Sequence, residues 1–187
     1  MSKTILHMIS VLTIIGLVVG GILSLVYYFA APLIEANRLK ALKEAIFYVL
    51  PEAKDYETIE KGGMIIYKGV DEEGNIIGYS FTADGPGYQA NIKMMVGLRT
   101  DLSKLNGMKV LEQLETPGLG NFIEDDFFQD QFKGLEFRPK IEYIKNRKPE
   151  KPNQIQALTG ATISSKAVTK NINNVIMDVI DVIKVQE

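Results

Sequence analysis

The chain has 187 residues and a formal net charge of −2, a length that suits a single domain with little besides. It contains no cysteine, and its one histidine is His7. These absences exclude a disulfide framework, an iron–sulfur cluster, a Cys/His zinc site, a haem attachment motif and a histidine-assisted catalytic pair in the polar part of the chain. Any redox chemistry must therefore come from an organic cofactor. No basic stripe is interleaved with aromatic residues, which argues against nucleic acid as a partner.

A long apolar segment opens the chain. Residues 4–34 hold no Asp, Glu, Lys or Arg, and all of the charged residues except Lys3 follow them. About 20 apolar residues cross a hydrocarbon core of about 30 Å, so the N-terminal segment 1–34 predicts one transmembrane helix at about 8–30. A cleaved signal peptide is the alternative, but its apolar region would be shorter, about 7–15 residues. Positive charges flank the segment on both sides, so their count does not decide its orientation, although it leans slightly against an outside domain.

Helical spacing continues beyond Pro32. Apolar residues recur on one face until Pro51 ends the pattern. They are Leu39, Leu42, Ile46, Val49 and Leu50. The pattern predicts an amphipathic connecting helix over 35–51, with its apolar face packed on the domain that follows at 52–187.

The first half of that domain alternates between apolar and polar residues, as strands do. Strands are expected at 64–67, 77–82, 92–98 and 108–114. Turn residues at 71–75 join the first two strands as a hairpin. A break is expected at 84–88, and a further turn at Asn106 and Gly107.

Helical spacing returns in the second half. The residues Ile123, Phe127, Phe128 and Phe132 share one face of a short predicted helix that Gly134 ends. A basic, proline-punctuated loop at 145–154 and a strand at 155–158 follow, and a closing helix runs from about Ser165 almost to the C-terminus. The expected fold class is α+β, with one N-terminal transmembrane helix and a single domain of antiparallel strands with flanking helices.

A hydroxyl-rich stretch precedes the closing helix. Residues 156–165 read Gln-Ala-Leu-Thr-Gly-Ala-Thr-Ile-Ser-Ser. Hydroxyls and free backbone N–H groups at a helix N-terminus bind phosphate, although an ordinary Ser or Thr cap is a competing interpretation. An ATPase phosphate loop is excluded because it needs a second glycine, and Gly160 is the only one here. A serine-hydrolase turn is excluded because it needs Gly-x-Ser-x-Gly and a histidine.

A second stretch predicts a loop of fixed shape. Residues 115–120 read Glu-Thr-Pro-Gly-Leu-Gly, so that two glycines and a proline stand beside one acid and one hydroxyl. A plain turn between a strand and a helix is the simpler interpretation of this stretch taken alone.

Together these motifs resemble the FMN-binding domain family. Thr159-Gly160-Ala161-Thr162, followed by Ile163, Ser164 and Ser165, is similar to the flavinylation motif Ser/Thr-Gly-Ala-Thr, whose last threonine carries FMN through a phosphoester bond in that family. The 115–120 loop resembles a second signature of the domain, and Gly87-Tyr88 with Ile92 resembles a third. Gln156 and Gln113 depart from the family, whose members often have Asp and His there.

The resemblance implies roles for individual residues. Thr162 would be the covalent attachment site for FMN, and a separate flavin transferase of the ApbE type would attach FMN from FAD. The residues implied around the phosphate are Thr159, Gly160, Ala161, Ser164 and Ser165. Those implied beside the ring system are Tyr88, Glu115, Thr116, Gly118, Leu119 and Gly120. Glu115 and Thr116 are expected to contact flavin rather than a metal, and no metal site is expected.

The order of the parts resembles the G subunit of the Rnf complex, an ion-translocating ferredoxin:NAD oxidoreductase. The resemblance implies an electron-transfer protein that works with other membrane subunits and is not an enzyme alone. It also implies a single-pass location in the inner (cytoplasmic) membrane, with a cytoplasmic N-terminus and the FMN domain on the outer face. Two alternatives stay open: the usually longer C subunit of the sodium-translocating NADH:quinone oxidoreductase, and a membrane-tethered binding module without flavin.

Overall fold

The computed structural model describes residues 3–185, which fall into two compact units divided after Ala41. The first unit is the N-terminal part of one long helix, α1 (Lys3–Val49), which continues without interruption through Pro32. The predicted transmembrane and connecting helices are therefore a single helix. Its large apolar side chains between Ile5 and Ile34 are exposed, as lipid contact requires, and α1 is long and apolar enough to cross a membrane.

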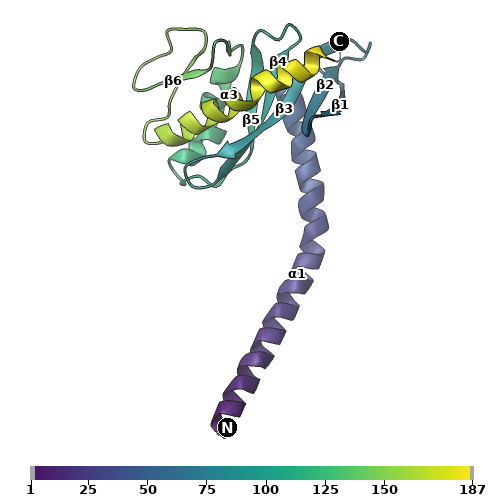
Figure 1. Cartoon of the computed structure of the whole chain (residues 1–187), viewed down its shortest axis with the longest axis vertical. Helices are drawn as coiled ribbons and strands as arrows, with labels where there is room; N and C mark the ends of the chain where they lie inside the picture. The colour runs from purple at the N-terminus through teal and green to yellow at the C-terminus, as the bar shows by residue number, and fades with distance from the viewer. Residues whose placement is uncertain (1–2, 186–187) are drawn as a thin grey trace. The chain divides into compact units, whose positions relative to one another are not determined.

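The second unit is built on a five-stranded antiparallel sheet (Figure 1). The strands are β1 (Asp55–Lys61), β2 (Met64–Val70), β3 (Ile76–Pro86), β4 (Asn91–Arg99) and β5 (Leu105–Glu112). Each strand pairs with the next one along the chain. The turn predicted at 71–75 is confirmed, since Asp71 Oδ1 accepts the backbone N–H groups of Glu73 and Asn75 at 2.9 and 2.8 Å.

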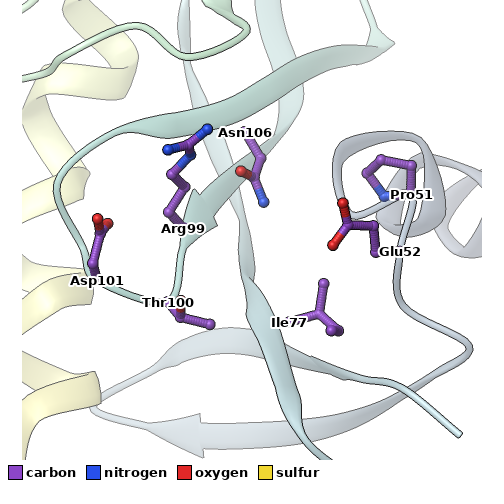
Figure 2. A pocket seen from close by; sticks show the side chains of 7 residues that line it. All are labelled: Pro51, Glu52, Ile77, Arg99, Thr100, Asp101 and Asn106. Atoms are coloured by element: carbon purple, nitrogen blue, oxygen red, sulfur yellow. The ribbon is translucent and has the colours of Figure 1, made fainter.

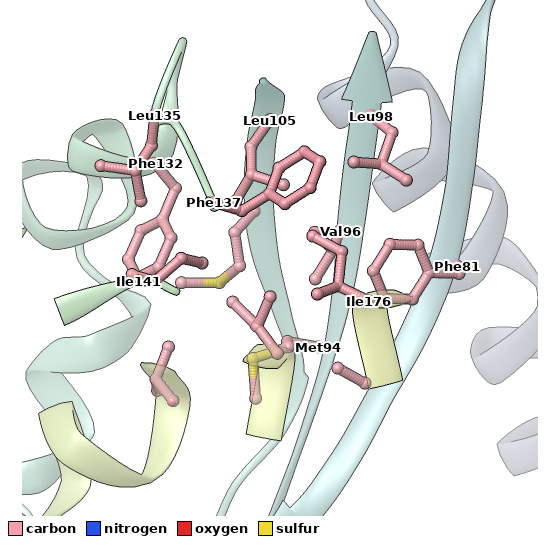
Figure 3. Packing of buried hydrophobic residues seen from close by; sticks show 14 of the residues in the cluster. Phe81, Met94, Val96, Leu98, Leu105, Phe132, Leu135, Phe137, Ile141 and Ile176 are labelled. Carbon is pink, nitrogen blue, oxygen red and sulfur yellow. The ribbon is translucent and has the colours of Figure 1, made fainter. Parts of the chain in front are cut away.

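One face of the sheet packs against the closing helix α3 (Thr162–Lys184). Alternate residues of a strand point to opposite faces, so Met94, Val96 and Leu98 of β4 all face α3 and are fully buried. Figure 3 shows Phe81 and Val96 of the sheet beside Ile176 of α3. This layer of apolar side chains is the main core of the domain.

The opposite face of the sheet receives the last turns of α1. Ala45, Ile46, Val49 and Leu50 are at most 3% exposed and pack with Tyr67 and Met95. Glycines make room for them: a Cβ on Gly97 would lie 2.7 Å from the Val49 carbonyl oxygen, and a Cβ on Gly69 would lie 2.8 Å from the Leu50 side chain. The end of the predicted amphipathic helix therefore packs on the domain, whereas Leu39 is exposed.

Short elements connect β5 to α3. They are η1 (Gly120–Glu124), α2 (Asp126–Gln129), η2 (Asp130–Phe132), β6 (Glu142–Ile144) and β7 (Gln154–Gln156). β6 and β7 form a separate parallel pair. Phe132, Phe137 and Ile141 from this region close one side of the main core (Figure 3).

The α+β class is confirmed, but several predicted boundaries are wrong. Asn106 and Gly107 lie inside β5, because the chain turns earlier, at 100–103. β3 runs through the predicted break as far as Pro86, since pairing with β4 satisfies its backbone. The single helix predicted around Phe128 is divided into η1, α2 and η2. The closing helix begins at Thr162 and not at Ser165.

Candidate functional site

Two loops leave the same end of the sheet. Pro86 at the end of β3 pairs with Asn91 at the start of β4, and Glu112 at the end of β5 pairs with Lys93 of β4. The loop at 87–90 and the loop that follows Glu112 are therefore neighbours. The structure also joins the second loop to the first turn of α3.

The first turn of α3 is open at its N-terminus. Its N-cap is Ala161, with φ −131° and ψ 40°, and no side chain forms a capping hydrogen bond. The interpretation of the hydroxyl-rich stretch as an ordinary Ser or Thr cap is therefore wrong. Backbone N–H groups of a first turn have no acceptor within the helix, and the positive end of the helix dipole lies there. Such a turn suits a phosphate group.

Thr162, the first residue of α3, is partly accessible, and Thr159 and Gly160 beside it are exposed. Gly160 has φ +80°, a conformation that residues with side chains disfavour. A Cβ at Gly160 would also lie 2.9 Å from Leu119 Cδ2. Leu119 belongs to the 115–120 loop, so the structure brings the two main motifs into contact.

Glu115 links these motifs to the third one. Its side chain is 4% exposed. Its Oε1 accepts the backbone N–H groups of Tyr88 at 2.8 Å and Gln89 at 3.1 Å, and its Oε2 accepts the Ser164 hydroxyl. One buried carboxylate thus connects the 87–90 loop, the 115–120 loop and α3.

Ser164 and Ser165 face the interior rather than the surface. Ser165 is fully buried. Its Oγ accepts the Leu158 N–H at 3.0 Å and donates to the Ala161 carbonyl oxygen at 3.0 Å. The two serines therefore hold the motif from inside, while Thr159, Thr162 and Ile163 reach the surface to different extents.

Thr116 and Gly118 lie in the 115–120 loop, whereas Gln113 precedes it and Gln156 ends β7. Thr116 Oγ1 accepts a hydrogen bond from Gln89 Nε2 at 2.9 Å, and Gly118 has φ +74°. Gln113 Oε1 accepts the backbone N–H of Glu115, while the Gln156 N–H bonds to Gln131 Oε1 at 2.6 Å. Gln89 was missed at the sequence level, because a lone exposed glutamine has no pattern that distinguishes it.

Exposed apolar side chains lie on the three segments that Glu115 connects. Tyr88, Leu119 and Ile163 are 62%, 45% and 57% exposed. Flat cofactor rings bind against apolar and aromatic side chains, with a few polar groups that fix their orientation. The open helix N-terminus, the partly accessible Thr162 and these apolar side chains fit the phosphate and the ring of FMN.

A pocket of about 350 Å³ lies elsewhere in the domain (Figure 2). Its lining includes Glu52, Arg99 and Asp101. Arg99 ends the strand that Asn91 begins, and at about 3.3 Å per residue the two ends of β4 are roughly 26 Å apart. None of the predicted site residues lines this pocket, so it is separate from the motifs around Thr162.

Comparison with known proteins agrees with this geometry. Residues 87–177 match the FMN-binding domain, a range that contains all three motifs. A solved structure of the C subunit of the Na(+)-translocating NADH-quinone reductase from Parabacteroides distasonis superposes with a TM-score of 0.55 at 20% identity. The match covers 65% of this chain and 73% of that one, and it shows a shared fold.

Two relatives match along most of their length. The G subunit of the ion-translocating oxidoreductase complex of Methanosarcina acetivorans is 32% identical over 94% of this chain and 94% of its own. The G subunit of the Na(+)-translocating ferredoxin:NAD(+) oxidoreductase complex of Acetobacterium woodii is 30% identical over 91% of this chain and 89% of its own. The chain therefore belongs to the family of G subunits of ion-translocating oxidoreductase complexes and carries its FMN-binding domain.

Proposed function

We propose that the chain is a membrane-anchored flavoprotein that carries FMN covalently on Thr162 and relays electrons within an Rnf-type ferredoxin:NAD oxidoreductase. One observation carries the attachment site: the partly accessible Thr162 begins a helix that no side chain caps, beside the 115–120 loop. FMN supplies reversible electron transfer, while the chain holds and orients it. A covalent bond prevents loss of the cofactor.

For the attachment reaction, the chain supplies the hydroxyl and a separate enzyme supplies the catalysis. The Thr162 O–H bond breaks and its oxygen bonds to the flavin-side phosphorus of FAD; the phosphoanhydride bond of FAD breaks, and AMP leaves with the proton. No electron is gained or lost in this step. The only histidine, His7, lies in the apolar segment, and we expect a flavin transferase of the ApbE type to provide the base.

Coexpression of the full chain with a flavin transferase tests the attachment. We expect a band that fluoresces under ultraviolet light after denaturing electrophoresis, and the mass of one FMN on the peptide that contains Thr162. Thr162→Ala should abolish both signals, whereas Thr58→Ala, at an exposed threonine of β1 outside the motifs, should retain them. Equal fluorescence of Thr162→Ala and the unmodified sequence would disprove attachment at Thr162.

The names of the two G-subunit relatives support the place of the chain in a redox complex. They match over about nine tenths of this chain, whereas the solved C-subunit structure supports only the fold. We expect a complex that contains Thr162→Ala to retain its subunits and to lose ferredoxin-dependent NAD reduction, measured in membrane vesicles. Full activity without the bound flavin would refute the electron-relay role.

The orientation of the anchor is a separate part of the proposal. We expect a cytoplasmic N-terminus and an FMN domain on the outer face of the inner membrane. Added protease should then digest the domain in intact spheroplasts, with a cytoplasmic protein as the undigested control. Protection of the domain would reverse the proposed orientation.

A further inference from the structure

Glu115 carries a carboxylate, yet it is buried. A buried charge is costly unless hydrogen bonds compensate it. Glu115 receives three such bonds, two from backbone N–H groups and one from the Ser164 hydroxyl. An ionised carboxylate accepts about four hydrogen bonds, so the chain itself occupies most of the accepting capacity of Glu115.

Two motif glycines make space for this carboxylate. A Cβ at Gly120 would lie 2.7 Å from Ser164 Oγ and 2.9 Å from Glu115 Cβ. A Cβ at Gly87 would overlap Glu115 Oε1. The absence of side chains at both positions is therefore explained by the approach of Glu115 and Ser164 to the backbone, without any contact to a cofactor.

The bond to Ser164 controls the direction of Thr162. Successive residues of an α-helix are turned by about 100° and rise by about 1.5 Å, so Thr162 stands roughly 200° around the helix from Ser164. Ser164 is 3% exposed and faces Glu115, and Thr162 consequently points away from it, toward the accessible side. Fixing Ser164 fixes the rotation of the first turn of α3.

We propose that Glu115 is a positioning residue for flavin attachment, which holds the first turn of α3 against the 87–90 and 115–120 loops so that the Thr162 hydroxyl is presented outward. This inference rests on the proposed attachment at Thr162. It assigns Glu115 to Ser164 and the loop backbone, in place of the direct contact with flavin that the family resemblance implied. Glu115→Gln keeps one oxygen that can accept the N–H groups of the loop, but it removes the charge and replaces the oxygen that accepts the Ser164 hydroxyl with an NH2 donor.

The rate of flavin attachment tests the proposal in the full chain. We expect Glu115→Gln and Ser164→Ala each to slow attachment by at least about tenfold at saturating FAD, because each removes a hydrogen bond to a charged group and a loss of about 1.4 kcal/mol is tenfold. The double variant should be little slower than either single one, since both remove the same bond. Unchanged rates in both single variants, or fully additive losses, would overturn the proposal.

A matched control is available one turn further along α3. Thr169 is 3% exposed, and its hydroxyl donates to the Lys166 carbonyl oxygen at 2.9 Å. Thr169→Val removes a buried hydroxyl without touching Glu115, so attachment should proceed at the unmodified rate. An equal loss of rate in Thr169→Val would show that any buried hydroxyl of α3 has the same effect, and would overturn the proposal.

Hydrogen exchange in the flavin-free full chain, in detergent, gives a second readout. In Glu115→Gln we expect faster amide exchange at Ser165, whose N–H bonds to the Ala161 carbonyl oxygen at the start of α3, with Tyr88, Gln89 and the rest of the sheet little changed. Unchanged protection of α3, or a uniform increase across the domain, would overturn the positioning role. If the unmodified chain acquires no flavin, the attachment proposal fails, and this exchange pattern still decides the role of Glu115.

Discussion

Neighbouring side chains in the hydroxyl-rich stretch have opposite environments. Ser164 and Ser165 are buried and hydrogen-bonded within the domain, whereas Thr159 is exposed and Thr162 is partly accessible. A hydroxyl that already serves the fold is a poor candidate for modification. At the scale of single residues, burial therefore favours a threonine over the two serines as the proposed site of flavin attachment.

The turn at 71–75 allows a prediction about pH. The side-chain amide of Asn75 lowers the pKa of Asp71, and the backbone N–H of Asn75 adds to the effect. Because the folded-state pKa is below the unfolded value of about 4, the stabilisation is complete above that pH and is lost as the pH falls through the folded-state pKa. We expect Asn75→Ala to raise the pKa of Asp71, measured by NMR titration of its carboxyl carbon.

Asp101 is the control for that titration. The hydroxyl and the backbone N–H of Ser103 lower the pKa of Asp101 in another turn, so Asn75→Ala should leave it unchanged. An Asp71 that titrates at the same pH in both proteins would mean that the Asn75 side chain does not stabilise the carboxylate.

The residues of the site were predictable from the sequence to different degrees. Thr162 and the 115–120 loop were identified because Thr-Gly-Ala-Thr and Glu-Thr-Pro-Gly-Leu-Gly are unusual combinations of residue types. The hydrogen-bond partners of Glu115 could not be predicted, since Glu115 and Ser164 are 49 residues apart in the chain. Their contact depends on which strand ends lie side by side, and local patterns do not contain that information.

At the scale of elements, glycines of the sheet determine how closely α1 can approach. Gly97 contacts Val49, and its cross-strand partner Gly107 in β5 does not. We expect Gly97→Ala to lower the free energy of unfolding by about 1–3 kcal/mol, because overpacking displaces the helix or the strand. Chemical denaturation of the full chain in detergent measures the change.

Gly107→Ala is the matched control. A Cβ there would meet only the flexible Lys133 side chain, at 3.7 Å, so we expect a change of less than about 0.5 kcal/mol, as is usual away from special features. Equal destabilisation by both substitutions would mean that loss of a strand glycine matters more than contact with α1.

Elements with strong patterns were predicted best. β4 and α3 have apolar residues at the spacing of a strand and a helix, and both were found. β1 was not predicted, because it has few apolar residues among its polar ones and most of it is exposed. It forms a strand because its backbone pairs with β2. The joining of two predicted helices into α1 was missed because Pro32 is typical of a helix end.

At the scale of the molecule, the compact domain begins at Leu42, inside α1. Ile46, Val49 and Leu50 are each at most 1% exposed, and burying such side chains contributes about 1.5–3 kcal/mol apiece. Their loss is comparable with the total stability of a domain, about 5–15 kcal/mol. A fragment that starts at Leu42 should therefore unfold cooperatively on heating, whereas one that starts at Glu52 should lack a cooperative transition. Circular dichroism distinguishes the two, and equal melting of both fragments would contradict this boundary.

The glycines that receive the end of α1 also have a consequence for the order of folding during synthesis. Chains emerge from the ribosome N-terminus first, so Val49 and Leu50 leave it before the glycines that they contact. Gly69 and Gly78 come next, and the surface for α1 is complete only when Gly97 and its strand have followed. Until then the apolar end of α1 has no protein surface to pack on. Translation pauses before β4 would prolong this exposed state, and pauses after β4 would not.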